Sequence, residues 1–277
     1  MLKFKVKREI CIQCGLCVKD CPVNIIDLKT GYPRIGADKE SNCIKCQHCL
    51  AICPTAALSI LGKNPNRSRS IKRDFPDPYQ METLIKGRRS IRHYQDENLD
   101  PELIKRALNV AWQAPTGVNM RQVHFFVIDD KDNLAVLRNE AYRGLEELIA
   151  RGQLPEDKAF FTGFVRAWKE KGVDVLFRGA PHLVVASAPS GGPSPLPDCL
   201  IALSYFELFA QSLDIGTLWN GLVKWTINDL VPELRTRLHI PEDHLIGYAM
   251  AFGKPAVQYQ RTIEKGSANI IPFNPSA

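Results

Sequence analysis

The sequence lacks three features that would indicate a membrane protein, a dinucleotide-binding protein or a secreted protein. It has no run of about 18 apolar residues, so we expect no segment to span a membrane. It has no Gly-x-Gly-x-x-Gly stretch after a strand-like run, which argues against a built-in dinucleotide domain. The opening stretch MLKFKVKREI contains no apolar signal segment. We therefore expect a cytoplasmic chain whose thiols stay reduced.

Acidic residues are sparse in the first 78 positions. This part holds fourteen Lys/Arg against seven Asp/Glu, a net charge of +7, whereas the remaining 199 residues hold 22 against 23. Such a basic region could attract an acidic redox partner over a distance, or it could be an ordinary solvated surface with a basic linker. No aromatic-rich or helix-turn-helix pattern accompanies the charge, so we expect no nucleic-acid partner.

Cysteine is sparse outside two short runs. Eight of the nine cysteines lie in CIQCGLCVKDCP, residues 11–22, and in CIKCQHCLAICP, residues 43–54. The remaining one, Cys199, opens the apolar stretch CLIALSYFELFAQSL. Free cysteines are usually buried, so we expect Cys199 to be a small core residue rather than a nucleophile.

Both cysteine runs read Cys-x2-Cys-x2-Cys-x3-Cys-Pro, and Gly15 helps the first one to turn. This is the spacing of bacterial iron–sulfur proteins, in which the fourth cysteine of a run binds the other cluster. Zinc and disulfides also use paired cysteines, but zinc explains neither the third cysteine nor the Cys-Pro ending. We predict two 4Fe-4S clusters, one held by Cys11, Cys14, Cys17 and Cys53 and the other by Cys43, Cys46, Cys49 and Cys21.

A polar stretch with three prolines, GKNPNRSRSIKRDFPDPY, follows the cysteine runs. This composition is typical of a linker between domains. We therefore predict a small two-cluster domain over residues 1–62, a linker over 63–78 and a second domain over 79–277.

The second domain alternates between strand-like and helical patterns, which indicates a layered α+β or α/β fold. Asp100 and Pro101 predict a helix start, and Thr226 with Asp229 resembles a capping box. The apolar runs predict strands at 123–128, 182–188 and 245–253, and helices are expected near 132–150, 155–171, 198–214 and 226–238.

Three arginines and a serine crowd the stretch GRRSIRHY: Arg88, Arg89, Ser90 and Arg92. Their guanidinium groups repel one another unless an anion lies between them, and the planar fork of arginine suits phosphate oxygens. By charge alone, a solvated basic helix end explains the stretch as well as a phosphate site does.

Four stretches in order, RRSIRHY, APTGVNMRQVHFFVI, DIGTLWNGL and FGKPAVQYQR, resemble the signature segments of the nitroreductase family of FMN-dependent reductases. The resemblance covers roughly residues 80–265. It implies an α+β sandwich domain, a homodimer, FMN as cofactor and a small oxidised substrate such as a nitro compound, a quinone or an activated alkene.

The resemblance also implies which residues hold FMN, while the sequence singles out no catalytic residue. Many relatives have a Gln where this chain has Arg121, which leaves that position's hydrogen-bonding role open. The implied residues are Arg88, Ser90 and Arg92 for the phosphate and ribityl chain with Arg89 beside them, Asn119 and Arg121 in the second segment, Trp219, Asn220 and Gly221 along the isoalloxazine, and Arg261 or Lys254 closing the phosphate site.

Iron–sulfur clusters pass single electrons, whereas a flavin can collect them and deliver a pair. We therefore expect a low-potential donor such as ferredoxin to feed the clusters, the clusters to feed FMN, and FMN to reduce the substrate. The alternative is an electron-transfer or redox-sensing protein with a protein acceptor. The substrate pocket is expected in segment 140–178, where four aromatic residues could line it or simply pack in the core: Phe160, Phe161, Phe164 and Trp168.

Overall fold

The computed structural model describes residues 1–71 and 74–275. The chain forms two compact units. The first unit contains Met1–Pro76 and the loop Thr116–Arg121, and the second contains Asp77–Pro115 and Gln122–Ala277. Among the described residues, no helix is both long and apolar enough to cross a bilayer.

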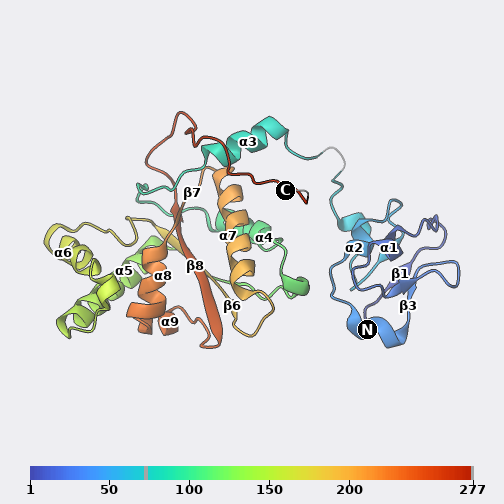
Figure 1. Ribbon diagram of the computed structural model, residues 1–277, viewed down its shortest axis with the longest axis horizontal. Helices are drawn as coiled ribbons and strands as arrows, with labels where there is room; N and C mark the ends of the chain where they lie inside the picture. Colours follow the sequence, from blue (N-terminus) through green and yellow to red (C-terminus); the bar gives the residue numbers. More distant parts are fainter. Residues whose placement is uncertain (72–73, 276–277) are drawn as a thin grey trace. The chain divides into compact units, whose positions relative to one another are not determined.

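The first unit is built from two similar halves (Figure 1). Helix α1 (Leu16–Lys19) recurs 32 residues later as α2 (His48–Ala51). Both strand pairs are antiparallel: β1 (Lys5–Val6) with β4 (Leu58–Ser59), and β2 (Ile26–Asp27) with β3 (Arg34–Ile35). Three 3-10 turns complete the described part of this unit: η1 (Ala37–Asn42), η2 (Pro65–Arg67) and, in the loop Thr116–Arg121, η3 (Gly117–Asn119).

The two cysteine runs have the same backbone conformation. In both halves three residues at equivalent positions are left-handed, a conformation that costs energy for any residue other than glycine. Gly15 has a φ of 73° and its counterpart Gln47 has a φ of 62°. The other equivalent pairs with positive φ are Gln13 with Lys45 and Asn24 with Ala56.

An antiparallel four-stranded sheet in the order β5-β6-β8-β7 forms the centre of the second unit (Figure 1). Its strands are β5 (His124–Ile128), β6 (His182–Pro189), β7 (Gly216–Trp219) and β8 (His244–Gly253). Three of them confirm the predicted strands, whereas β7 is only four residues long and was not predicted.

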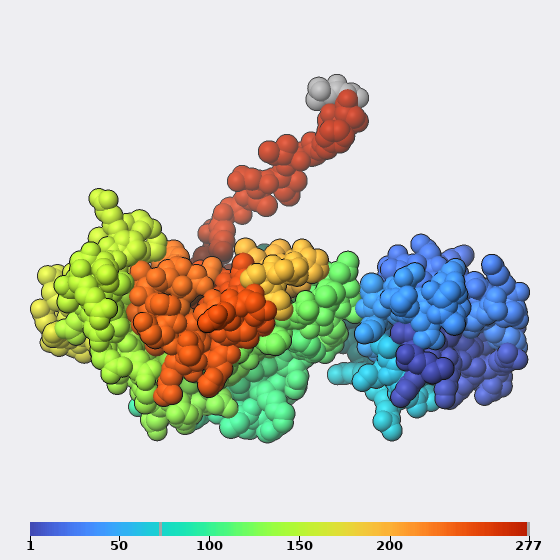
Figure 2. Space-filling view, turned by 90° about the horizontal axis from the view of Figure 1, so that it is seen from below, coloured from blue at the N-terminus to red at the C-terminus, as the bar shows by residue number. Residues whose placement is uncertain are grey.

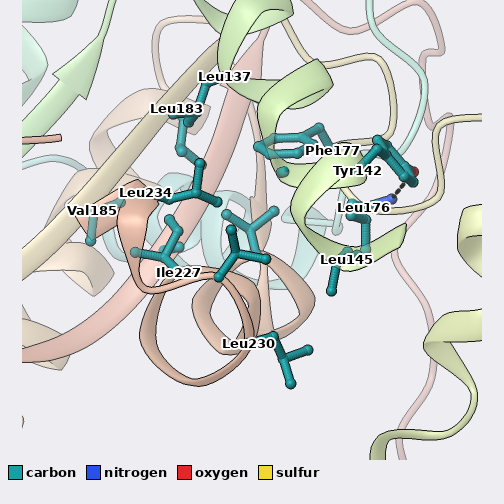
Figure 3. Packing of buried hydrophobic residues seen from close by; sticks show 14 of the residues in the cluster. Leu137, Tyr142, Leu145, Leu176, Phe177, Leu183, Val185, Ile227, Leu230 and Leu234 are labelled. Carbon is teal, nitrogen blue, oxygen red and sulfur yellow. Dashed lines mark hydrogen bonds between the residues drawn. The ribbon is translucent and has the colours of Figure 1, made fainter. Parts of the chain in front are cut away.

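Helices cover both faces of this sheet. Alternate residues of β6 point to opposite faces: Val184 and Ala186 belong to the apolar cluster of α4 and α7, and Leu183 and Val185 to that of α5 and α6 (Figure 3). The layered α+β fold expected from the sequence is thus confirmed. The helices are α3 (Pro78–Gly87), α4 (Pro101–Ala111), α5 (Lys131–Ala150), α6 (Phe161–Lys171), α7 (Pro195–Gln211), α8 (Gly221–Trp225) and α9 (Glu233–Arg237), with the 3-10 turn η4 (Glu156–Lys158).

Capping residues in the sequence predicted one helix start correctly and another wrongly. Asp100 caps α4 as predicted, since its carboxylate accepts a hydrogen bond from the Glu102 amide at 2.9 Å. The single helix predicted over 226–238 is wrong, because a π-helical turn, η5 (Thr226–Leu230), and a non-helical Val231 precede α9. The predicted capping box is also wrong: the Thr226 hydroxyl donates to the Leu222 carbonyl at 2.8 Å.

Beyond β8 the chain leaves the sheet as an exposed segment (Figure 2). It carries apolar side chains that are largely in solvent, among them Ile271 at 93% and Phe273 at 91% exposure.

Candidate functional site

The cysteines of the first unit gather into two sets of four. Cys11, Cys14 and Cys17 line one cavity together with Cys53 from the other run. The second cavity is lined by the other four, Cys21, Cys43, Cys46 and Cys49. Each set therefore combines three cysteines of one run with the fourth of the other, the combination that the spacing predicts, and four cysteine thiolates are the usual ligands of a 4Fe-4S cluster.

The surroundings of the two cavities act on the thiols in opposite ways: burial raises the pKa of Cys17, and raises that of Cys49 to about 12, whereas hydrogen bonds to sulfur favour the thiolate. Backbone amides donate to sulfur, from Ala57 to Cys53 at 3.3 Å and from Lys45 to Cys43 at 3.4 Å. Apolar residues such as Ile25 and Ile60 pack around the buried cysteines, among them Cys17 and Cys49, whereas Cys14 is exposed. Hydrogen bonds to sulfur and exclusion of solvent are two of the means by which a protein sets the potential of an iron–sulfur cluster.

Cys199 has a different environment. It lies on α7 with no exposed surface, and burial raises the pKa of its thiol to about 12. Gly247 of β8 packs directly on it, because a Cβ at that position would overlap the Cys199 side chain. The expectation of a core residue is confirmed.

The arginine segment runs beside the edge strand β7. Arg88 ends α3, Ser90 forms a parallel bridge with Thr217, and the Ile91 amide donates to the Thr217 carbonyl at 2.9 Å. The sheet edge therefore fixes the backbone of this segment.

Arg88 is paired with a glutamate that the sequence analysis missed. Its Nη1 lies 3.1 Å from Glu207 Oε1, and the two side chains are 25% and 10% exposed. Glu207 also accepts from Thr217 Oγ1 at 3.3 Å and from Trp219 Nε1 at 3.0 Å. A glutamate among the apolar residues in the second half of α7 was the available signal, because a charge at such a position needs a partner.

Arg89 and Arg92 turn towards backbone carbonyls of the same segment. Arg89 Nη1 donates to the Arg88 carbonyl at 2.6 Å, and Arg92 Nη1 donates to the Ser90 carbonyl at 3.3 Å. Arg89 Nε is buried and has no hydrogen-bond acceptor among the described residues. Buried donors are usually paired, so this segment has unused capacity for an anion.

The segment Trp219, Asn220 and Gly221 links β7 to α8. Asn220 is 3% exposed; its side chain caps α8 by accepting from the Val223 amide at 3.0 Å and donates to the Leu176 carbonyl at 2.8 Å. Its side chain is therefore committed to the scaffold, which leaves the backbone of this segment to face a ligand. Leu176, whose carbonyl accepts from Asn220, is itself held by Tyr142: the Tyr142 hydroxyl accepts a hydrogen bond from the Leu176 amide at 3.1 Å (Figure 3).

The remaining predicted cofactor residues lie in two places. The Lys254 carbonyl accepts from the Gln95 amide at 2.9 Å, which brings Lys254 next to the end of the arginine segment. Arg261 lies in the exposed segment beyond β8. Asn119 and Arg121 belong to the first unit, where Asn119 Nδ2 donates to the Ile44 carbonyl at 2.8 Å.

Three of the four candidate pocket aromatics pack in the core. Phe161 is fully buried, and Phe164 and Trp168 pack against the same apolar cluster. Phe160 is 44% exposed, and the centroid of its ring lies 6.4 Å from that of Trp225. Lys158 Nζ lies over the Trp225 ring, 4.6 Å from its centroid.

Known proteins resemble both parts of the chain. The model of the nitroreductase family matches residues 85–254, and that of the 4Fe-4S dicluster domain matches residues 10–57. The dicluster match implies two 4Fe-4S clusters.

Individual relatives have low sequence identity to this chain. A protein of Methanothermobacter thermautotrophicus, provisionally named an NADH dehydrogenase/NAD(P)H nitroreductase, is 28% identical over 62% of this chain and 75% of its own length. A nitroreductase with bound FMN from Bacteroides fragilis has a TM-score of 0.56 at 24% identity, covering 70% of this chain and 99% of that one. One from Desulfitobacterium hafniense, also with bound FMN, has a TM-score of 0.55 at 23% identity, covering 70% and 98%. These structures share the fold.

Proposed function

Because the chain belongs to the nitroreductase family and carries a 4Fe-4S dicluster domain, we propose that it is an FMN-dependent oxidoreductase fed by a low-potential electron donor. Electrons would pass through the two clusters to FMN and on to a small oxidised substrate. The observation that carries the proposal is the presence, in one chain, of two four-cysteine cavities and an arginine segment ordered along β7.

We assign the clusters to the two cysteine sets that line the cavities. The eight sulfur atoms would bind iron as thiolates, and the apolar packing around them would limit the access of solvent and oxygen. A cluster domain would be superfluous in a flavoprotein that takes electron pairs directly from its donor, which is why we favour a one-electron donor such as ferredoxin.

FMN would lie along the edge of the sheet at β7. The phosphate would be held by Arg88, Arg89, Ser90 and Arg92, and the buried Arg89 Nε, which has no acceptor among the described residues, supports an anion there. The isoalloxazine would lie against the backbone of Trp219 to Gly221. FMN, when bound, supplies the conversion of single electrons into a hydride equivalent.

The substrate would be a planar, electron-poor molecule such as a nitro compound, a quinone or an activated alkene. Phe160 and Trp225 are exposed aromatic side chains that could stack on such a ring. We also propose that the protein is a homodimer, since Ile270, Ile271 and Phe273 present apolar surface that a partner subunit could cover.

The direct test is stopped-flow reoxidation of the anaerobically reduced, full-length protein by a panel of nitro, quinone and enoate compounds. An oxidoreductase of this kind should give flavin reoxidation rates that saturate with the concentration of at least one compound class. If no compound reoxidises the flavin while oxidised ferredoxin does, the protein is an electron carrier and not a reductase of small molecules.

A further inference from the structure

We propose that Glu207 is a positioning residue that holds the Arg88 guanidinium ready for the phosphate of FMN. The inference rests on the proposed function, because it takes the arginine segment as the phosphate site. It adds to that site a residue that would not touch the cofactor and lies on a different element, α7.

The placement of Glu207 is unusual for a charged residue. Its neighbours on α7, Phe206 and Ala210, are fully buried, and Glu207 as a whole residue is 8% exposed. A carboxylate at such a position is costly unless its oxygens are paired. Here both oxygens are used, Oε1 by Arg88 and Thr217 and Oε2 by Trp219.

Glu207 joins two segments that would bind opposite ends of the cofactor. Arg88 belongs to the phosphate segment, and Trp219 to the segment along the isoalloxazine. Thr217, the third partner, lies on β7 and bridges through its backbone to Ser90. One carboxylate therefore links the phosphate segment to β7, whose last residue, Trp219, begins the isoalloxazine segment.

The ion pair occupies only part of the arginine fork. Glu207 accepts from Nη1, and a guanidinium has five N–H donors, so the rest of the fork remains available for phosphate oxygens. A free arginine side chain loses several rotamers when it binds an anion. Arg88 has already lost them in the pair with Glu207, so phosphate binding costs less conformational entropy.

The negative charge of Glu207 also opposes a phosphate, and the neighbouring cations decide which effect is larger. Arg89 and Arg92 lie on the same short segment and supply positive charge without Arg88. An unpaired Arg88 would repel them. We therefore expect the gain from orientation to exceed the repulsion between the carboxylate and the phosphate.

The test is a double-mutant cycle on full-length protein, kept anaerobic so that the clusters survive. Glu207→Gln keeps the size of the side chain and one acceptor for Trp219, but removes the charge that holds Arg88. The dissociation constants of FMN and of riboflavin, which lacks the phosphate, are measured by flavin fluorescence in four proteins: wild type, Glu207→Gln, Arg88→Ala and the double variant. Glu82→Gln, which removes the same charge from an exposed pair with Lys86 on α3, is the matched control.

We expect Glu207→Gln to weaken FMN binding about 10-fold, the size of one charge-assisted hydrogen bond, and riboflavin binding less than about 2-fold. In the Arg88→Ala background the same change should alter FMN binding less than about 2-fold. Glu207→Asp, which keeps the charge, should restore part of the loss and covers the case in which Glu207→Gln folds poorly.

Two results would overturn the role of Glu207. One is an equal loss of FMN and riboflavin affinity in both backgrounds, which would indicate a purely structural residue. The other is tighter FMN binding by Glu207→Gln, which would mean that the carboxylate competes with the phosphate. If Arg88→Ala alone leaves FMN binding unchanged, the proposed phosphate site is wrong instead.

Discussion

At the scale of single residues, burial and partners distinguish side chains of the same type. Cys199 and the eight cysteines of the first unit all carry free thiols, yet only the eight lie at ligand spacing around a cavity. Burial raises the pKa of Cys199 to about 12, but it raises the pKa of the predicted ligand Cys49 as far. The position of a cysteine around a cavity, and not the pKa of its thiol, therefore distinguishes the eight from Cys199.

We therefore expect Cys199→Ala to retain eight iron atoms and eight acid-labile sulfides per chain, as two 4Fe-4S clusters require. Its free energy of unfolding should fall by about 1 kcal/mol, because a buried sulfur is removed from a packed core. Iron and sulfide analysis of the anaerobically purified protein measures the first effect. A variant that lost iron would show that Cys199 is a ligand and that the assignment of the other cysteines needs revision.

Arg88→Ala should weaken FMN retention by about 1.5–3 kcal/mol, the worth of a charge-assisted hydrogen bond to phosphate. Arg151→Ala, which removes an exposed arginine paired with Glu147 on α5, is the matched control and should leave FMN binding unchanged. Flavin released on dilution, followed by its fluorescence, gives both affinities. Equal FMN affinity in the two variants would mean that the phosphate lies elsewhere.

The role of a residue could be predicted from the sequence where it depends on neighbours along the chain, and not where it depends on a distant segment. The cysteines were predictable because their spacing along the chain is itself the signal. The pairing of Arg88 with Glu207 joins positions 119 apart in the sequence and depends on how α7 packs against β7. The sequence around Arg88 does not identify Glu207 as its partner, and the reverse is also true. The one glutamate among the apolar residues of α7 indicates only that its charge needs some partner.

At the scale of elements, hydrophobic pattern was a reliable guide where the element is long and buried. Strand β6 is apolar on both faces because helices cover both sides of the sheet, and its bounds agree with the prediction to within one residue. Strand β7 offered only four residues beginning with Gly216, too few for a periodic pattern. The single helix predicted over 226–238 was wrong because Pro232 and the non-helical Val231 interrupt it.

Alanine substitutions at two helical glycines test this packing, because we expect them to change the free energy of unfolding in opposite directions. Gly144 lies inside α5, where an added Cβ would overlap Cγ1 of Val231, whereas a Cβ at Gly163 in α6 meets nothing within 4 Å. Alanine is favoured over glycine in a helix by about 1 kcal/mol, so Gly163→Ala should be stabilising by up to that amount. Gly144→Ala should instead be destabilising by about 1–3 kcal/mol, because overpacking outweighs the helix preference.

Chemical unfolding of the two variants measures both effects. Val231→Ala should recover part of the loss in Gly144→Ala, because it removes the methyl groups that the new Cβ would meet. A stabilising Gly144→Ala would show that α5 and the turn before α9 are not packed as described.

At the scale of the whole molecule, the question is why one chain combines a cluster domain with a flavin domain. The positive charge is concentrated in the first 78 residues, at +7, while the rest of the chain is close to neutral. If a low-potential carrier with an acidic surface docks there, charge attraction would raise its association rate. Exposed charges are screened beyond a Debye length of about 8 Å at physiological salt. The rate of flavin reduction by ferredoxin should therefore fall steeply as ionic strength rises.

The path of the electrons can be separated from the docking step with a pair of cysteine variants. Cys46→Ala removes a predicted ligand of one cluster, and Cys199→Ala removes a core thiol that is not a predicted ligand. Anaerobic bleaching of the flavin by reduced ferredoxin should be slowed about 10-fold or more in Cys46→Ala and unchanged in Cys199→Ala, because a broken cluster interrupts single-electron transfer. Dithionite, a small reductant that reaches the flavin without the clusters, should bleach both variants at similar rates. If NADH instead bleaches the flavin equally fast in both variants and ferredoxin bleaches neither, electrons reach FMN without the clusters, and the cluster domain must serve some other purpose.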